Sequence, residues 1–281
     1  MPDRQQTGRD KVVSGAIPSL SGTFAHDEIS MAVTTAGLLP EQTRELVGLY
    51  AEDLSWEAAG EQWHAERRAG RGSRESAQKI LHLIRERLNA AGSSLPTLKQ
   101  LAEFLEAESS VTARAQLLYL YLVEADDLVR FTLHELLRDQ GLDRSSWDLS
   151  KDSIRGYLHS FRYRDESPLE YADSTLDRWT RGFRAVLRDI GVRESRYTDR
   201  GGTPSLTDGP LAVSSGYSWH RAEDEWEQLP LGWLYLFQPE ADWPSLRTRL
   251  REFSTWEESR TPRGNYLRPT GDPFAPEGIR R

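Results

Sequence analysis

The sequence predicts an all-α fold, built as a two-part helical bundle with at most a short β-hairpin. Apolar residues recur at helical spacing along most of its 281 residues. Ser, Thr, Pro and Gly stand at the limits of these periodic segments, where they favour helix starts and ends. The acidic break Glu124–Asp127 interrupts the pattern, and a second part is expected to begin near residue 125.

The first part is expected to be a helical bundle domain over residues 26–125, preceded by a disordered tail over residues 1–25. The tail is rich in Ser, Gly, Asp and Gln and lacks apolar periodicity. Pro40 favours the start of the first helix, and Ser55 and Ser73 are suited to cap the next two. The last two helices of the bundle are marked by Leu98, Leu101 and Leu105 and by the apolar run Leu117–Val123.

The second part is expected to be a helical, winged-helix-like domain over residues 126–260. Two helices, Leu128–Gln140 and Lys151–Phe161, precede a third helix that ends at Gly191. The Gly-, Ser- and Arg-rich segment Val192–Gly216 then predicts a loop or a short β-hairpin. Helix, helix, third helix and loop is the order of winged-helix proteins, whose third helix enters the major groove of DNA.

The third helix has two possible starts, a Ser-Pro-Leu-Glu capping box at Ser167–Glu170 and a later start at Asp173 or Ser174. Further helices are expected over Trp219–Phe237 and Trp243–Trp256. Residues 261–281 contain four prolines, which predicts an extended tail.

The third helix is the strongest candidate for a DNA contact. Its apolar residues fall within a sector of about 100°, and its arginines lie roughly opposite. At its amino end Ser174 and Thr175 are expected to meet phosphates or base edges through backbone N–H groups. The expected side-chain contacts are Arg178, Arg181, Arg184 and Arg188 on the helix and Arg196 and Arg200 in the following loop.

Two observations leave a simpler interpretation open. Asp177 stands four residues before Arg181, and Asp173 is close by, so the arginine face is partly neutralised and is also explained as a solvated helix surface. A second basic helix offers four further candidates for phosphate binding, although ordinary solvation explains them better: Arg71, Arg74, Lys79 and Arg85.

Composition narrows the class of protein. The net charge is −8, yet the 36 basic residues include only 4 lysines, which leaves 32 arginines. A GC-rich genome explains this bias, and arginine is also the better ligand for phosphates and base edges. Cysteine is absent, and no apolar stretch is long enough to span a bilayer. We therefore expect a soluble, cytoplasmic protein that does not bind membranes.

Motifs for catalysis and cofactors are missing from the sequence. Neither G-x-x-x-x-G-K-[ST] nor G-x-G-x-x-G occurs, and the six histidines form no His-x-x-x-His pair. His220 stands near Glu223 and Asp224, a grouping better explained as an exposed acidic face than as a metal site. We expect no catalytic residue, no bound metal and no cofactor, and hence no enzyme.

Three blocks of sequence resemble the BrxA family of bacteriophage-exclusion (BREX) systems, and together they cover most of residues 30–191. They are Thr34–Thr43 with the Leu-Ser-Trp-Glu that begins at Leu54, Arg71–Leu88, and Asp173–Gly191 with its Ser-x-x-Thr start and Leu-x-x-x-Gly end. The resemblance implies a helical fold whose N-terminal half is similar to the RNA-binding antitermination factor NusB. It also implies DNA binding without catalytic residues.

The leading hypothesis is a non-catalytic accessory protein of a phage-defence system that binds double-stranded DNA weakly to moderately and in a salt-sensitive way. One alternative is a protein scaffold, in which the acidic segments Asp27–Glu57 and Trp219–Trp243 dock other phage-defence proteins. Another is RNA binding through the basic helix Arg71–Leu88, which predicts a preference for single-stranded or hairpin RNA.

Overall fold

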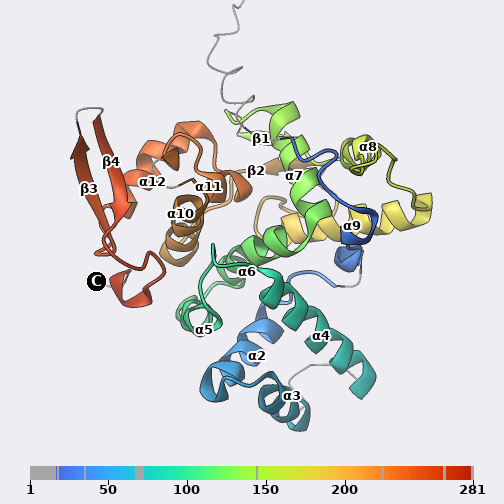
Figure 1. Cartoon of the computed structure of the whole chain (residues 1–281), viewed down its shortest axis with the longest axis horizontal. Helices are drawn as coiled ribbons and strands as arrows, with labels where there is room; N and C mark the ends of the chain where they lie inside the picture. Colours follow the sequence, from blue (N-terminus) through green and yellow to red (C-terminus); the bar gives the residue numbers. More distant parts are fainter. Residues whose placement is uncertain are drawn as a thin grey trace, which may run out of the picture.

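The computed structural model describes residues 17, 19–34, 36–66, 73–143, 145–222, 225–261 and 264–279. Over these residues the fold is mainly helical, with two short antiparallel sheets of two strands each (Figure 1). The predicted all-α class with a short hairpin is thereby confirmed. The predicted disordered tail does not hold near its end, because Ile17 and Phe24 are buried in the core; residues 1–16 lie outside the described part.

The N-terminal helices begin where the sequence placed their caps. Pro40 opens its helix, and the Ser55 and Ser73 hydroxyls accept hydrogen bonds from the backbone N–H groups of Ala58 and Ser76. The elements in this region are η1 (His26–Glu28), η2 (Ala32–Thr34), α2 (Pro40–Asp53), α3 (Trp56–Ala65), α4 (Arg74–Ala90), α5 (Leu98–Ala107) and α6 (Val111–Ala125).

The middle of the chain alternates helices with a small sheet. Its elements are α7 (Asp127–Gln140), β1 (Ser146–Asp148), α8 (Lys151–Ser160), α9 (Asp173–Asp189) and β2 (Arg200–Gly202). Strand β1 pairs antiparallel with β2, so that Trp147 lies opposite Gly201. A Cβ atom on Gly201 would lie 2.5 Å from Leu149 Cδ1, which explains why glycine occupies this strand.

Helix α6 lies at the centre of the fold. Figure 1 shows α2, α3 and α4 below it, α8 and α9 to one side, and the C-terminal elements to the other. Ten of its fifteen residues are buried, as its unbroken apolar run predicts. The predicted boundary near residue 125 falls between α6 and α7, yet α6 packs against helices on both sides of it.

The C-terminal region departs most from the sequence prediction. Leu211–Val213, expected in a loop or hairpin, are buried in helix α10, and Trp256, expected in a helix, begins a strand. The segment expected as an extended tail instead completes a β-hairpin. The elements are α10 (Asp208–Ala222), α11 (Leu231–Tyr235), η4 (Glu240–Asp242), α12 (Trp243–Leu250), β3 (Trp256–Thr261), β4 (Gly264–Pro269) and η5 (Pro276–Gly278).

Two aromatic residues connect the C-terminal hairpin, and the segment that follows it, to the rest of the fold. The Trp226 indole Nε1 donates a hydrogen bond to the Leu267 carbonyl at 2.8 Å. Phe274 packs so closely on α10 that a Cβ atom at Gly216 would lie 2.4 Å from its ring. These contacts are between residues far apart in the sequence, so local propensity gave no signal for them.

Candidate nucleic-acid interface

Helix α9 begins at the later of its two predicted starts. Its N-cap is Ala172, and the predicted capping box at Ser167–Glu170 lies outside the helix. Its apolar side is buried as its periodicity predicts. The buried residues on that side are Leu176, Trp179, Phe183, Val186 and Leu187.

The amino end of α9 offers less to a phosphate than predicted. The Thr175 backbone N–H donates to the Ala172 carbonyl at 2.8 Å, so this amide is already used. Ser174 is exposed, and Thr175 is half-buried. Of these two residues, only Ser174 is therefore exposed at the amino end of α9, where the sequence predicts a contact.

Arg178 and Arg181 are exposed on the outer face of α9. Within the described residues Arg178 has no hydrogen bond or ion pair, and Arg181 donates only to the Asp177 carbonyl of its own helix, at 3.3 Å. The predicted Asp177–Arg181 ion pair is therefore wrong. Both guanidinium groups face solvent without a carboxylate partner in this part of the structure.

The two carboxylates expected to neutralise this face belong to another ion-pair group. Arg155, on α8, donates to Asp173 at 2.7 Å and to Asp177 at 2.9 Å. Because one arginine binds both carboxylates, it offsets one of their two negative charges and holds both at the edge where α8 meets α9. The outer face of α9 is left with Arg178 and Arg181 as its unpaired charges among the described side chains.

Arg184 does not belong to the exposed face, which corrects its assignment as a DNA contact. It is 7% exposed and forms an ion pair with Asp199, with a further hydrogen bond to the Thr198 carbonyl at 3.3 Å. Its helical position lies at the edge of the arginine stripe, where the following loop covers it. Arg188 remains exposed and pairs with its neighbour Asp189 at 2.9 Å.

Arg193 is a buried residue that holds the α9–β2 loop in place, and the sequence analysis did not predict this role. Its guanidinium donates to the carbonyls of Arg184, Arg196 and Thr198. Burial lowers its pKa, as does the nearby charge of Arg184. Nothing in the local sequence separates Arg193 from the other loop arginines, because its burial depends on where the loop folds back.

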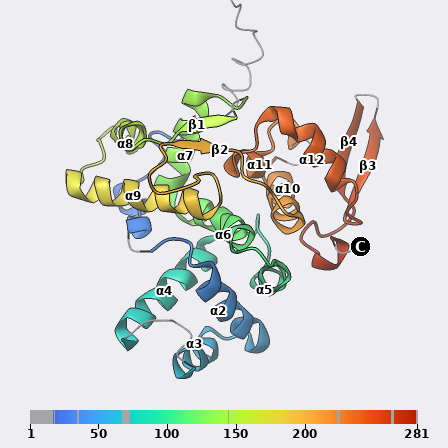
Figure 2. The ribbon, with the colours of Figure 1, turned by 180° about the vertical axis from the view of Figure 1, so that it is seen from behind.

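The outer part of this loop carries the other two predicted contacts. Arg196 and Arg200 are exposed, and Arg200 begins strand β2. Arg196 lies over the ring of Tyr197, with its Cζ atom 4.6 Å from the ring centroid. Tyr197 is 77% exposed and was not among the predicted site residues. Figure 2 shows the loop beside the carboxyl-terminal part of α9.

The second predicted surface lies on a separate helix, α4. Arg74 and Arg85 are exposed, and Lys79 pairs with Glu75 at 2.7 Å. Arg71 lies outside the described residues. The structure thus places three of these four residues on one element that packs against α3 and α6.

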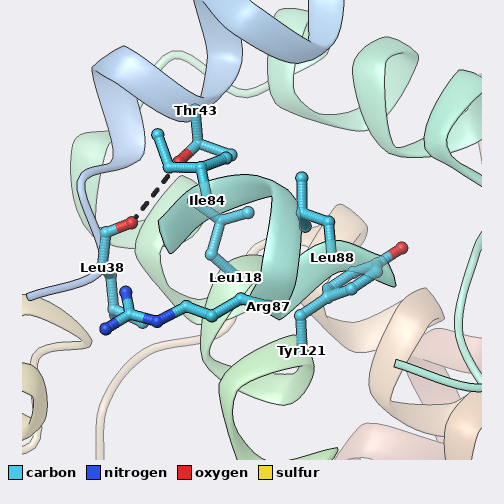
Figure 3. Close-up of a pocket in the computed structure, with 7 residues that line it drawn as sticks. All are labelled: Leu38, Thr43, Ile84, Arg87, Leu88, Leu118 and Tyr121. Carbon is cyan, nitrogen blue, oxygen red and sulfur yellow. Dashed lines mark hydrogen bonds between the residues drawn. The ribbon is translucent and has the colours of Figure 1, made fainter. Parts of the chain in front are cut away.

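Helix α4 also carries a buried arginine that the sequence reading did not single out. Arg87 donates to the Gly37 carbonyl at 2.6 Å and to the Ala36 carbonyl at 3.0 Å, and burial lowers its pKa to about 10. Figure 3 shows it among apolar side chains around a cavity of about 10 Å³, the space of a single water molecule. Its position seven residues after Ile80 is a helical signal that it faces the core.

A larger cavity of about 170 Å³ is also lined by Arg87 and reaches Asp126. Asp126 caps α7, and its Oδ1 atom accepts from the backbone N–H groups of Leu128 and Val129 at 3.1 Å. Its Oδ2 atom accepts no hydrogen bond from the described residues. Burial raises the Asp126 pKa to about 7, against the opposing effects of these hydrogen bonds and of Arg87.

The described residues contain no group of three or more His, Asp or Glu side chains placed to hold a metal ion. His220 stacks on Phe274 with 5.3 Å between ring centroids, while Glu223 and Asp224 lie outside the described part. As for membranes, none of the helices that can be described is both long and apolar enough to cross one.

Comparison with known proteins gives a family and a fold. The family model for BrxA matches residues 28–203 of the 281 residues. The fold is similar to the crystal structure of an uncharacterized protein from Magnetospirillum magneticum, with a TM-score of 0.55, 19% identity, and coverage of 74% of this chain and 99% of that one. Among curated proteins there is no match. Because this match covers more than half of the chain and includes α2 through β2, the chain belongs to the BrxA family.

Proposed function

We propose that this chain binds double-stranded DNA as a non-catalytic accessory protein of a BREX-type phage-defence system. The BrxA family points to BREX-type phage defence. The observation that best supports DNA binding is the outer face of α9, where Arg178 and Arg181 are exposed while Arg155 holds the two nearest carboxylates. Unpaired guanidinium groups on a rigid helix are well suited to phosphates and guanine edges.

The order of elements supports a winged-helix mode of docking. Helix α7, strand β1, helices α8 and α9 and strand β2 follow one another, and β1 pairs with β2. In helix-turn-helix relatives the last helix of such a unit lies in the major groove. In our proposal α9 takes this place, and the α9–β2 loop contacts the adjoining backbone through Arg196 and Arg200.

The charge distribution supports weak to moderate, salt-sensitive binding. The chain carries a net charge of −8, so nonspecific attraction to DNA is limited. Because Arg184 is engaged in an internal ion pair with Asp199, few arginines remain available on the outer face of α9. Because each phosphate contact contributes about 0.9 to the slope of log K against log salt, a small number of contacts gives a shallow but measurable dependence.

Charge reversal on α9 tests the proposal by fluorescence anisotropy with a labelled duplex. We expect Arg178→Glu and Arg181→Glu each to weaken binding about tenfold, through loss of one phosphate contact and repulsion of another. Arg260→Glu is the matched control, since Arg260 is exposed on β3, which lies on the opposite side of the molecule from α9 in Figures 1 and 2.

Three outcomes separate the proposal from its alternatives. Equal loss in all three variants, or no loss in the α9 variants, contradicts a contact through α9. Binding to hairpin RNA that depends on Arg74 and Arg85 favours RNA binding through α4. Correctly folded protein that binds no nucleic acid at low salt favours a scaffold role with other phage-defence proteins.

A further inference from the structure

The tip of the α9–β2 loop holds an aromatic ring that the fold does not use. Tyr197 is 77% exposed, the highest value among the exposed large hydrophobic residues described. Its ring is backed by the Arg196 guanidinium at 4.6 Å, and Arg196 also donates a hydrogen bond to the Tyr197 hydroxyl. Because most of the surface of the ring is in solvent and its ring contact is with the Arg196 side chain, the ring contributes little to the core.

The backbone beneath the ring is nevertheless firmly held. The Tyr197 N–H donates to Ser195 Oγ at 3.2 Å, and Ser195 Oγ shares a hydrogen bond of 2.9 Å with Thr198 Oγ1. Arg193, 3% exposed, binds the carbonyl oxygens on both sides of Tyr197. Two buried arginines of the fold, Arg184 and Arg193, thus hold a loop whose tip is an exposed aromatic residue.

Several arginines stand close to Tyr197 in the fold or in the sequence. Arg184 donates to the carbonyl of Thr198, the residue after Tyr197, and it stands one helical turn after Arg181 on α9. Arg200 follows in β2. Aromatic rings beside positive charge stack on nucleobases irrespective of sequence, and an arginine behind the ring adds a cation–π contribution.

We propose that Arg196 and Tyr197 form a stacking platform for an unpaired nucleobase. In a continuous duplex the faces of the bases are covered by their neighbours, so the platform needs a base at a gap, a bulge or an overhang. The inference rests on the proposed DNA binding by α9, which places a duplex beside the loop. It makes DNA with a single-stranded region next to a duplex the preferred ligand, since α9 binds the duplex and Tyr197 binds the adjoining base.

The test compares a continuous duplex with the same duplex carrying one unpaired 2-aminopurine. We expect the native chain to bind the second DNA about 5- to 100-fold more tightly and to quench its 2-aminopurine fluorescence. Tyr197→Ala should abolish this preference and the quenching and leave duplex affinity within about twofold. Tyr197→Phe keeps the ring and should retain both. Because Tyr197 is so exposed, neither variant should alter the fold, which circular dichroism checks.

The outcomes also separate this inference from the proposed function. If duplex binding depends on Arg178 and Arg181 but Tyr197→Ala leaves the preference and quenching unchanged, the platform is refuted and the α9 interface stands. If the duplex is not bound while unpaired DNA is bound through Tyr197, the α9 proposal fails and the stacking site remains. If the native chain neither binds the DNA with the unpaired base more tightly nor quenches its 2-aminopurine fluorescence, the stacking platform is refuted. That result would favour a protein contact for the exposed ring.

Discussion

Arg155 Nη1 on α8 lies 2.9 Å from Asp177 Oδ1 on α9, and this ion pair holds a carboxylate at the edge of the candidate interface. The same arginine binds Asp173 at 2.7 Å. Arg155 thereby holds at the α8–α9 edge two carboxylates that would otherwise neutralise the arginines of α9 or repel the phosphates of DNA. The charge of the exposed face of α9 therefore depends in part on Arg155, which stands 18 residues before Asp173 in the sequence.

Removing Arg155 should weaken DNA binding even if Arg155 never touches DNA. In Arg155→Ala the carboxylates of Asp173 and Asp177 lose their shared partner, and the net charge of this group beside Arg178 and Arg181 changes from −1 to −2. We expect a loss of about three- to tenfold in duplex affinity, measured by anisotropy at low salt, where charges act over a Debye length of about 10 Å or more.

A triple variant distinguishes this indirect effect from a direct contact. Arg155→Ala combined with Asp173→Asn and Asp177→Asn removes the carboxylates along with their partner. If Arg155 acts by neutralising them, affinity should return to the native value or rise slightly above it, because the triple variant lacks the one net negative charge of the native group. Persistent loss in the triple variant would instead make Arg155 itself a phosphate ligand.

Arg193 should be essential for the stability of the loop. Its guanidinium satisfies three carbonyl oxygens in a buried position, and hydrogen bonds to a charged donor contribute about 1.5–3 kcal/mol each. We expect Arg193→Met to lower the free energy of unfolding by about 2–4 kcal/mol in urea denaturation. Arg178→Met, at an exposed and unpaired position, should change it by less than about 0.5 kcal/mol.

Gly182 on α9 is required for a close approach of η2. A Cβ atom at Gly182 would lie 2.4 Å from the Val33 carbonyl oxygen, a backbone atom that cannot move without shifting η2. Gly182→Ala should therefore lower the free energy of unfolding by about 1–3 kcal/mol. Gly156, in helix α8, has nothing within 4 Å of such an atom, and Gly156→Ala should raise stability by about 0.5–1 kcal/mol.

The two glycine variants share the same chemical change, so their difference isolates the contact with Val33. Thermal unfolding of the pair is sufficient to measure it. Equal shifts in Tm for both variants would mean that η2 is not packed on α9 in solution.

Asp126 should make stability fall as pH rises toward neutrality. Its carboxyl group has a pKa of about 7 in the fold, raised by burial from an ordinary value of 3.8. Between these values the folded chain holds a proton that the unfolded chain has lost, so the contribution of this group to the free energy of unfolding declines from about pH 4 to about pH 7. The full loss corresponds to roughly 4 kcal/mol.

Asp126→Asn isolates this effect from the other carboxyl groups. The amide oxygen can still accept the hydrogen bonds from Leu128 and Val129, and asparagine is an equally good N-cap. The stability of the variant relative to the native chain should rise between pH 5 and pH 8, as the native group becomes charged. A difference that is constant with pH would contradict a raised pKa at this position.

Much of the helical architecture could be predicted because its causes are local. Pro40 opens α2, Ser55 and Ser73 cap α3 and α4, and the apolar side of α9 is buried. Capping and amphipathic periodicity depend on residues within a few positions of each other. The C-terminal hairpin was missed because the pairing of β3 with β4 and the docking of Trp226 on β4 depend on tertiary contacts.

The sequence alone determined that α9 is an amphipathic helix with arginines opposite its apolar side, since helical geometry follows from residue spacing. Only the tertiary structure decided which of those charges are available. Arg184 is buried beneath the α9–β2 loop, and Arg193 is buried within it. Arg155 binds the carboxylates of the adjacent helix, and Tyr197 is left exposed at the tip of the loop. The physical reason is that an ion pair depends on distance in space, and residues on α8, α9 and the loop come within 4 Å only after the chain folds.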